Sequence, residues 1–361
     1  PLKSSLGWIW ASGEAEPVNR ASKPEQKTGL QTRGTGDGLR NDMPKIKVCH
    51  VNTRFLRAGG AKNTLFTVAG LDKSRYEIDL VVGRDVFRPQ VDAVDGVNLI
   101  VVPSMTRNIH PLQDLKTLVA LFRLFRQRRY QLVHTHLAKA GMLGRLAAKM
   151  AHVPIIVHSL HGSTFYDGQS PVARGSYILL ERLAGRMTDC FIAVGDDLRN
   201  RYIAQNIGRP SQYVVIHSGM DLDRFVAAGD LTQQEVEAKK ADLGIEAGDA
   251  VIGAVSSLEP RKGHIYLIEA AKEVVSQHPK VKFLLAGEGF YREELERAVK
   301  REGVGGHFVF AGYREDVPEV MATFDILALT SLWEGLPQVL VQAAAVGRPI
   351  VTFDVEGARE V

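Results

Sequence analysis

The chain has 361 residues, enough for two domains with separate cores, and its 45% apolar and 24% charged residues are typical of a globular protein. A formal net charge of +4 is too small to indicate a nucleic-acid-binding protein, and no apolar run is long enough to cross a bilayer. Two cysteines exclude a disulfide framework and a four-cysteine zinc site. Because Cys49 and Cys190 lie in apolar runs, as reduced thiols do, we expect a cytoplasmic protein.

Residues 1–42 differ from the rest of the chain. They are rich in Ser, Gly, Lys, Arg and Glu and show neither a helical nor an alternating period. Their one apolar cluster is Gly7–Trp10. We therefore expect this segment to be disordered or an upstream extension, and the folded protein to begin at Met43.

From Met43 onward, short β-branched runs alternate with longer helical periods, which predicts parallel α/β sheets. Two such series indicate two Rossmann-like domains in tandem: residues 43–225, a linker with a helix at 226–248, and residues 249–361. The chain stops soon after a strand, so we expect the second domain to be incomplete. The predicted strands are 46–53, 78–82, 97–102, 132–134, 155–160, 190–194, 251–256, 282–287, 307–312, 325–330 and 349–353.

Two segments of the second series follow strands, where open α/β sheets bind ligands. Arg261 and Lys262 precede a helix, which suits a bound anion at its N-terminus or else a solvated basic turn. Glu334 precedes another helix that carries Gln342. A carboxylate and an amide at this edge could grip sugar hydroxyls, although Glu334 could instead cap the helix.

Four histidines occur in the first series. His134 and His158 lie within strand-like runs, where core positions are expected. His136 and His161 lie past the predicted strand ends and are the candidates for hydrogen bonds to a substrate. The H-x-H spacing would also suit a metal, but no neighbouring carboxylate or cysteine completes a ligand set. We therefore predict no metal site.

Together these segments resemble the retaining glycosyltransferases of family 4. The resemblance runs from about residue 46 to 361 and is carried by SSLEPRKGHIYLIEA, LLAGEG, VVIHSGMDLDRF and the stretch containing EGLP. It implies the GT-B fold, with two facing Rossmann-like domains. It also implies transfer of a sugar from a nucleotide-diphosphate sugar to an acceptor, with retained configuration and neither cofactor nor metal.

The resemblance assigns roles to matching residues. His161 would lie beside the donor sugar and phosphate, Lys262 would bind the diphosphate, and Glu334 would hold the sugar; these are the expected catalytic residues. His136 is expected on the acceptor side. The remaining expected donor contacts are Gly59, Gly60, Ser257, Arg261, Gly287, Tyr313, Gly335, Leu336 and Gln342.

Two departures from the family pattern bear on activity. Ser257 stands where the family usually has an arginine for the diphosphate, and Gln342 where it usually has a second glutamate. Arg261 could supply part of the missing charge. A nucleotide-sugar-binding protein with weak or lost turnover therefore remains as an alternative. A sugar-nucleotide epimerase, an enzyme class on the same fold, is a further alternative.

The expected partners are a nucleotide sugar and a glycan or lipid-linked acceptor, with no nucleic acid. The segment 115–130 is apolar on one side and rich in arginine at its end. It predicts a helix that covers the sheet, and it could also contact anionic lipid at the inner face of the cell membrane.

Overall fold

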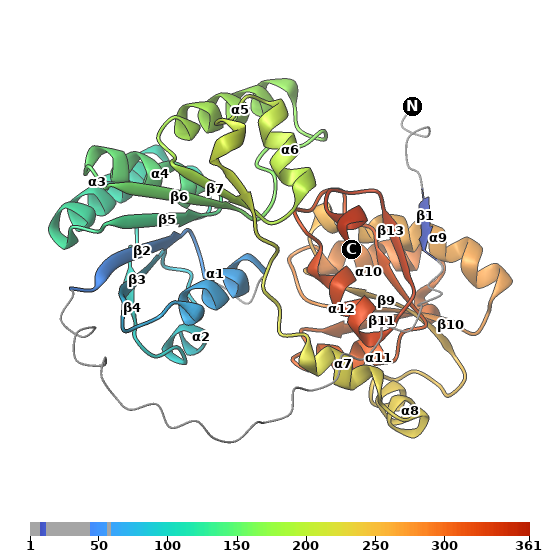
Figure 1. Ribbon diagram of the computed structural model, residues 1–361. Coiled ribbons are helices and arrows are strands. Elements are labelled where there is room, and N and C mark those ends of the chain that lie inside the picture. Colours follow the sequence, from blue (N-terminus) through green and yellow to red (C-terminus); the bar gives the residue numbers. More distant parts are fainter. Residues whose placement is uncertain (1–7, 12–43, 56–58) are drawn as a thin grey trace, which may run out of the picture.

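The computed structural model describes residues 8–11, 44–55 and 59–361. It contains two α/β domains that lie side by side, each with one sheet (Figure 1). The first sheet is parallel, in the order β4-β3-β2-β5-β6-β7-β8, and the second has the order β1-β13-β12-β9-β10-β11. The prediction of two Rossmann-like domains with parallel sheets is confirmed.

The strands of the first domain are β2 (Ile46–Asn52), β3 (Tyr76–Val82), β4 (Val97–Val101), β5 (Leu132–His136), β6 (Ile155–Leu160), β7 (Cys190–Ala193) and β8 (Tyr213–Val215). Its helices are α1 (Gly59–Gly70), α2 (Arg88–Asp92), α3 (Pro111–Arg128), α4 (Ala138–Met150), α5 (Pro171–Gly185) and α6 (Asp196–Ala204). Because helices cover both faces of a parallel sheet, its central strands are buried, and four consecutive residues of β5 from Val133 onward are buried.

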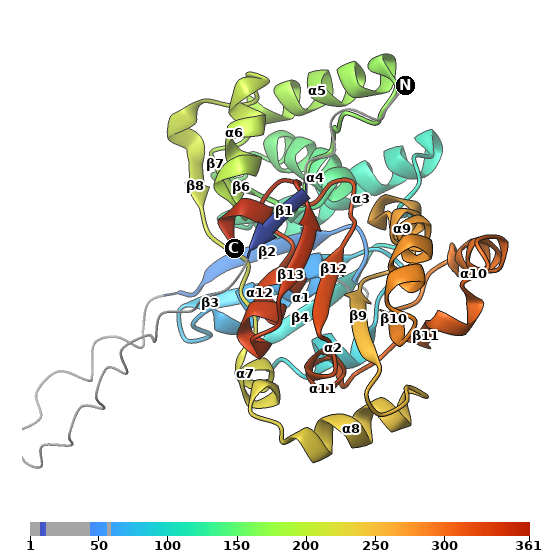
Figure 2. The ribbon, with the colours of Figure 1, turned by 90° about the vertical axis from the view of Figure 1, so that its right-hand side faces the viewer.

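The strands of the second domain are β9 (Ala250–Val255), β10 (Val281–Ala286), β11 (Phe308–Gly312), β12 (Ile326–Leu329) and β13 (Ile350–Phe353). Its helices are α7 (Asp223–Gly229), α8 (Gln233–Asp242), α9 (His264–Gln277), α10 (Arg292–Arg301), α11 (Val317–Ala322) and α12 (Gln338–Val346). Figure 2 shows β13, β12, β9, β10 and β11 side by side, with α9 and α10 at the right of the view.

The edge of the second sheet differs from the prediction. Trp8–Ala11 form β1, which pairs antiparallel with β13 in the register Trp8 to Phe353. The expectation of disorder over residues 1–42 therefore does not hold for these four residues; the rest of that segment lies outside the described residues. An added antiparallel edge strand has no counterpart in the alternating pattern from which the sheet was predicted.

The connection between the domains is more ordered than a linker. Phe225, which the sequence places in the first domain, packs in the core of the second with Ala228 of α7 and with Leu243 and Ile245, which follow α8. Helix α8 begins with a capping box, in which Thr232 and Glu235 each bond the other's backbone N–H. Residues 223–245 thus contribute apolar side chains to the second domain, a role that their polar composition conceals.

Helix α3 shows how a sheet-covering helix forms here. Pro111 stands at its first position, and Thr117, Leu121 and Phe125 form its buried stripe at intervals of four. It ends where Arg129 takes the left-handed conformation with φ 55°. Among the helices of the described part of the chain, none is long and apolar enough to span a membrane.

Candidate active site

The site lies where the carboxyl ends of the two sheets face each other (Figure 1). The domains touch here through backbone. A Cβ on Gly335 would lie 2.4 Å from the carbonyl oxygen of His161 in the other domain. Within the second domain, a Cβ on Gly357 would lie 2.5 Å from the carbonyl oxygen of Gly335. Only glycine permits this approach, so the EGLP loop of the second domain rests on the loop that follows β6 in the first.

Side chains hold the two domains in this arrangement. The rings of Tyr166 and Trp333 stack with centroids 3.7 Å apart and an interplanar angle of 11°. The Glu360 carboxylate accepts hydrogen bonds from the backbone N–H groups of Asp196 and Asp197, at 2.8 and 2.9 Å. These two N–H groups begin α6, where the helix dipole favours a negative charge. The domains are therefore closed on each other.

Three charged side chains of the second domain meet at this interface. Lys262, in the turn before α9, places its Nζ 2.5 Å from Oε1 of Glu334. Arg261 places Nη1 3.6 Å from the other oxygen of the same carboxylate. The side chains of Lys262 and Glu334 are 13% and 12% exposed, so the pair is largely but not completely shielded from solvent.

Burial and pairing both act on the ionisation of this pair. Burial lowers the pKa of Lys262, while the adjacent Glu334 carboxylate raises it in part. Burial raises the pKa of Glu334, but Lys262 and Arg261 outweigh that effect and leave it below its usual range. Arg261 also forms an ion pair with Glu259 at 3.4 Å, so Lys262 and Arg261 share two carboxylates in this arrangement. An anion that displaces one of these carboxylates would meet both cations.

The loops that present these residues need glycine for a local reason. Gly263, between Lys262 and α9, has φ 62°, and a Cβ there would lie 2.0 Å from the Thr330 carbonyl oxygen. This close contact holds the basic turn against the end of β12, from which the loop carrying Glu334 departs. Sequence-distant Lys262 and Glu334 are brought together in this way.

The first domain contributes His161 opposite the charged cluster. Its ring lies 3.8 Å from the position that a Cβ on Gly60 would occupy, so it sits beside the start of α1. Its Nε2 lies 3.0 Å from Nδ1 of His136. Burial lowers the pKa of His161 to about 4, so its ring is neutral at physiological pH.

More histidines lie behind His161. Nitrogens of His50, His134 and His136, all buried, lie within 4.8 Å of one another, a group that could hold a metal ion. These rings also make hydrogen bonds: His50 Nδ1 lies 3.1 Å from His136 Nε2, and His134 Nε2 lies 2.8 Å from Ser159 Oγ. A metal bound through Nδ1 of His50 or Nε2 of His136 would break the bond between them, because that nitrogen would become the ligand.

Comparison with known proteins identifies the family to which the chain belongs. Residues 235–361 match the family "Glycosyl transferases group 1", and residues 58–219 match the "Glycosyl transferase 4-like domain". An Escherichia coli protein named UDP-Gal:alpha-D-GlcNAc-diphosphoundecaprenol alpha-1,3-galactosyltransferase is 30% identical; the match covers 88% of this chain and 82% of that protein. The chain belongs to the group 1 glycosyltransferases.

Other relatives agree with this assignment. The Staphylococcus aureus capsular polysaccharide biosynthesis glycosyltransferase CapM is 25% identical, over 72% of this chain and 67% of its own. The crystal structure of Anabaena HepE in complex with UDP and glucose superposes with a TM-score of 0.72 at 24% identity, covering 87% of this chain and 82% of HepE. The fold of this glycosyltransferase is therefore GT-B.

The glycosyltransferase places the expected donor residues at two facing edges. In the second domain all of them lie in segments that follow strands, except Gln342, which lies on α12. Ser257 follows β9, and Gly287 follows β10 with φ 148°. Tyr313 follows the edge strand β11 and is 41% exposed, and Gln342 is half-buried on α12. The structure brings Arg261, Lys262 and Glu334 into one cluster, with Gly60, His161 and Gly335 beside it.

One site prediction needs correction. His136 was expected past a strand end, on the acceptor side. Strand β5 instead continues to His136, which pairs in register with Asn52 and Ser159 of its neighbours. The side chain is fully buried and hydrogen-bonded to two other histidines, so it cannot contact an acceptor directly in this structure. The core positions expected for His134 and His158 are confirmed.

Some residues of the interface had no sequence signal. Gln338 begins α12, and its side-chain oxygen lies 3.4 Å from the Cβ position of Gly59 in the other domain. Glu356 forms an ion pair with Arg201 of α6. Each contact joins residues of different domains, and no local period or spacing reports such a pair.

Proposed function

We propose that this glycosyltransferase transfers a hexose from a UDP-sugar to a sugar held on a lipid diphosphate, with retained anomeric configuration and without a metal. The observation that carries the proposal is the cluster of Lys262, Arg261 and Glu334, closed over by Gly335 and His161. The Escherichia coli relative, named for UDP-galactose and a diphosphoundecaprenol acceptor, supports this choice of donor and acceptor.

The cluster suits the charge changes of such a transfer. When the bond between sugar and phosphate breaks, negative charge develops on the diphosphate. Lys262, Arg261 and the free N–H groups at the start of α9 would stabilise that charge. Glu334 would accept hydrogen bonds from sugar hydroxyls, and on donor binding the diphosphate would take its place beside Lys262. Arg261 would supply part of the charge that is missing at Ser257 once a ligand displaces its carboxylate partners.

We assign the proton of the acceptor hydroxyl to the leaving phosphate. The acceptor oxygen forms a bond to the anomeric carbon on the face that the phosphate leaves, and its proton passes to a phosphate oxygen. No protein base is required for this step. The closed interface excludes water and so suppresses hydrolysis of the donor.

The test is transfer from UDP-galactose to N-acetylglucosamine linked through a diphosphate to a lipid, with the anomeric configuration of the product read by NMR. We expect an α-linked product from the α-linked donor. A β-linked product would contradict retention. Binding of the donor without any product would favour the binding protein, and an epimerised nucleotide sugar would favour the epimerase.

We also propose that the outer face of the first domain contacts anionic lipid on the cytoplasmic side of a membrane. Helix α4 packs against both α3 and α5. These helices, each described in full, expose apolar side chains, with Leu112 70% and Val172 81% exposed. The other exposed apolar residues on them are Leu115, Val119, Leu146, Met150, Leu179, Leu180 and Leu183.

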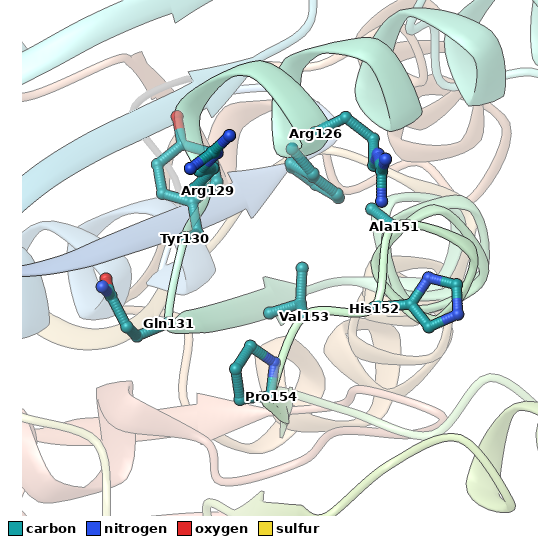
Figure 3. Close-up of a pocket in the computed structure, with 9 residues that line it drawn as sticks. Arg126, Arg129, Tyr130, Gln131, Ala151, His152, Val153 and Pro154 are labelled. Carbon is teal, nitrogen blue, oxygen red and sulfur yellow. The ribbon is translucent and has the colours of Figure 1, made fainter.

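The charges on this face favour an anionic surface. Every exposed charged side chain on the three helices is basic, and the set comprises Lys116, Arg123, Arg126, Lys149 and Arg182. Beyond the end of α3, a hollow of about 480 Å³ is lined by Arg126, Arg129 and His152 among others (Figure 3). It lies at the amino ends of β5 and β6, away from the cleft, where it could take a lipid headgroup.

Flotation with vesicles tests this contact. We expect the protein to float with phosphatidylglycerol-containing vesicles and to remain unbound with pure phosphatidylcholine, because each basic residue near an anionic surface contributes about 1 kcal/mol. The double variant Leu115→Glu, Leu179→Glu should lose binding. Phe290→Glu, which places one such charge at a 75% exposed site of the second domain, should not. Equal flotation of the unmodified protein and both variants would show that this face does not contact the membrane.

A further inference from the structure

Three histidines form a hydrogen-bonded row that ends at the cleft. His50 lies in β2, His136 ends β5, and His161 follows β6; these strands are neighbours in the sheet. His50 Nδ1 lies 3.1 Å from His136 Nε2, and His136 Nδ1 lies 3.0 Å from His161 Nε2. We call these three residues the histidine row. It runs from the core of the first domain to the loop that meets Gly335.

All three rings are neutral near pH 7. Burial lowers the pKa of His50 to about 4 and that of His161 to about 4, and it lowers the pKa of His136 well below its usual range. A neutral imidazole carries one N–H and one bare nitrogen. Each hydrogen bond of the row needs one of each, so the tautomer of any member fixes the tautomers of the others.

The row therefore has two possible sets of tautomers, and the inner end of the row decides between them. His50 Nε2 is buried and has no hydrogen-bond partner in the described part of the chain. Among buried backbone groups, N–H donors are left without a partner less often than acceptors are, and we apply the same preference to this ring, which puts the bare nitrogen at Nε2. His50 then donates from Nδ1 to His136 Nε2, and His136 donates from Nδ1 to His161 Nε2. The hydrogen of His161 is left on Nδ1.

We propose that His136 and His50 are positioning residues, which hold His161 in the Nδ1–H tautomer so that it donates a hydrogen bond to an oxygen of the nucleotide sugar. The role at the donor rests on the proposed function. Within residues 44–55 and 59–361, no group hydrogen-bonds Nδ1 of His161, and the ring stands beside Gly60 and next to the Gly335 contact.

The direction in which the hydrogen bonds of the row run matters because of the ligand's chemistry. Phosphate, ring and hydroxyl oxygens of a nucleotide sugar all accept hydrogen bonds, and a bare ring nitrogen would repel a phosphate oxygen. If the hydrogen bonds of the row ran in the opposite direction, Nδ1 of His161 would be that bare nitrogen. The row therefore gives His161 a fixed donor without giving it a charge.

The first test reads the tautomers directly. Histidine is labelled with ¹⁵N in the full chain without ligand, and long-range ¹H–¹⁵N spectra distinguish Nδ1–H from Nε2–H rings. We expect Nδ1–H for His161. His136→Leu should give a mixture of tautomers at His161 and lower kcat/KM for UDP-galactose about tenfold, the effect of one net hydrogen bond. His50→Leu should act in the same direction although it lies one ring further away.

Two further variants separate positioning from a general loss of stability. His136→Asn keeps an N–H donor near the place of Nδ1 and should restore both the His161 spectrum and most of kcat/KM. His158→Leu removes another buried histidine, which bonds Thr135 instead of the row. It should leave the His161 tautomer unchanged.

The proposal is overturned if His161 is mainly Nε2–H in the unmodified protein, or if one equivalent of zinc binds His50 and His136. The tautomer is read without ligand, so its failure is distinct from failure of the proposed function. If His161 were Nε2–H while UDP-galactose still bound, only the proposed role of the histidine row would be rejected. Absent UDP-galactose binding would remove the donor site itself.

Discussion

Lys262→Ala is expected to lower kcat/KM for the nucleotide sugar by about 10²–10³-fold, the usual cost of losing a group that stabilises charge in the transition state. Lys262 lies 2.5 Å from Glu334, and Arg261 is the other cation near that carboxylate. Removing Lys262 also leaves Glu334 less neutralised, so the remaining carboxylate would repel the diphosphate. Initial rates of transfer at varied donor concentration measure the effect.

The matched control is Lys239→Ala. Lys239, on α8, also pairs with a carboxylate of the second domain: its Nζ lies 3.0 Å from Oδ2 of Asp316, and among the described residues its ion pairs do not include Glu334. We expect near-normal kinetics from this variant. If Lys262→Ala retained turnover close to that of the unmodified protein, Lys262 would not be part of the site.

Gly335→Ala should lower kcat/KM by about 10²-fold without unfolding the protein, since misplacing reacting groups by about 1 Å costs this much. The added Cβ would lie 2.4 and 2.8 Å from the carbonyl oxygen and carbon of His161, and 2.9 Å from Gly162 Cα. All three atoms are backbone and cannot turn aside, so the domains must separate at this point. Kinetics and small-angle scattering report the two consequences.

Gly305→Ala is the control for that variant. It lies in the same domain, and a Cβ there would meet nothing within 4 Å. We expect unchanged kinetics and an unchanged radius of gyration. Normal activity of Gly335→Ala would mean that catalysis does not use the closed arrangement described here.

Much of the fold could be predicted because each domain follows a local rule. Each predicted strand agrees with a strand of the structure to within about two residues, since buried parallel strands appear as short β-branched runs. The short edge strand β8 (Tyr213–Val215) is not among the predicted strands. The exceptions have physical reasons. Strand β1 adds at an edge through backbone pairing that composition does not encode, and β5 reaches His136 because its neighbours continue the ladder.

The sequence predicted which residues lie at the carboxyl edge of each sheet, but not how the residues of the two edges meet. Loops after strands pointed to Lys262, Glu334 and His161, but their mutual placement depends on the contact between Gly335 and His161. The Tyr166–Trp333 stack joins residues of different domains, and the histidine row joins residues of three strands. Neither set of contacts produces a periodic pattern in a single sequence.

The central claim is that Lys262 and its neighbours bind the diphosphate of the donor. Titration calorimetry of the unmodified protein and of Lys262→Ala with UDP and with uridine tests it most directly, because the two ligands differ only in the diphosphate. We predict that the variant loses most of its affinity for UDP while uridine binds both proteins equally weakly. Equal affinity of both proteins for UDP would contradict the claim.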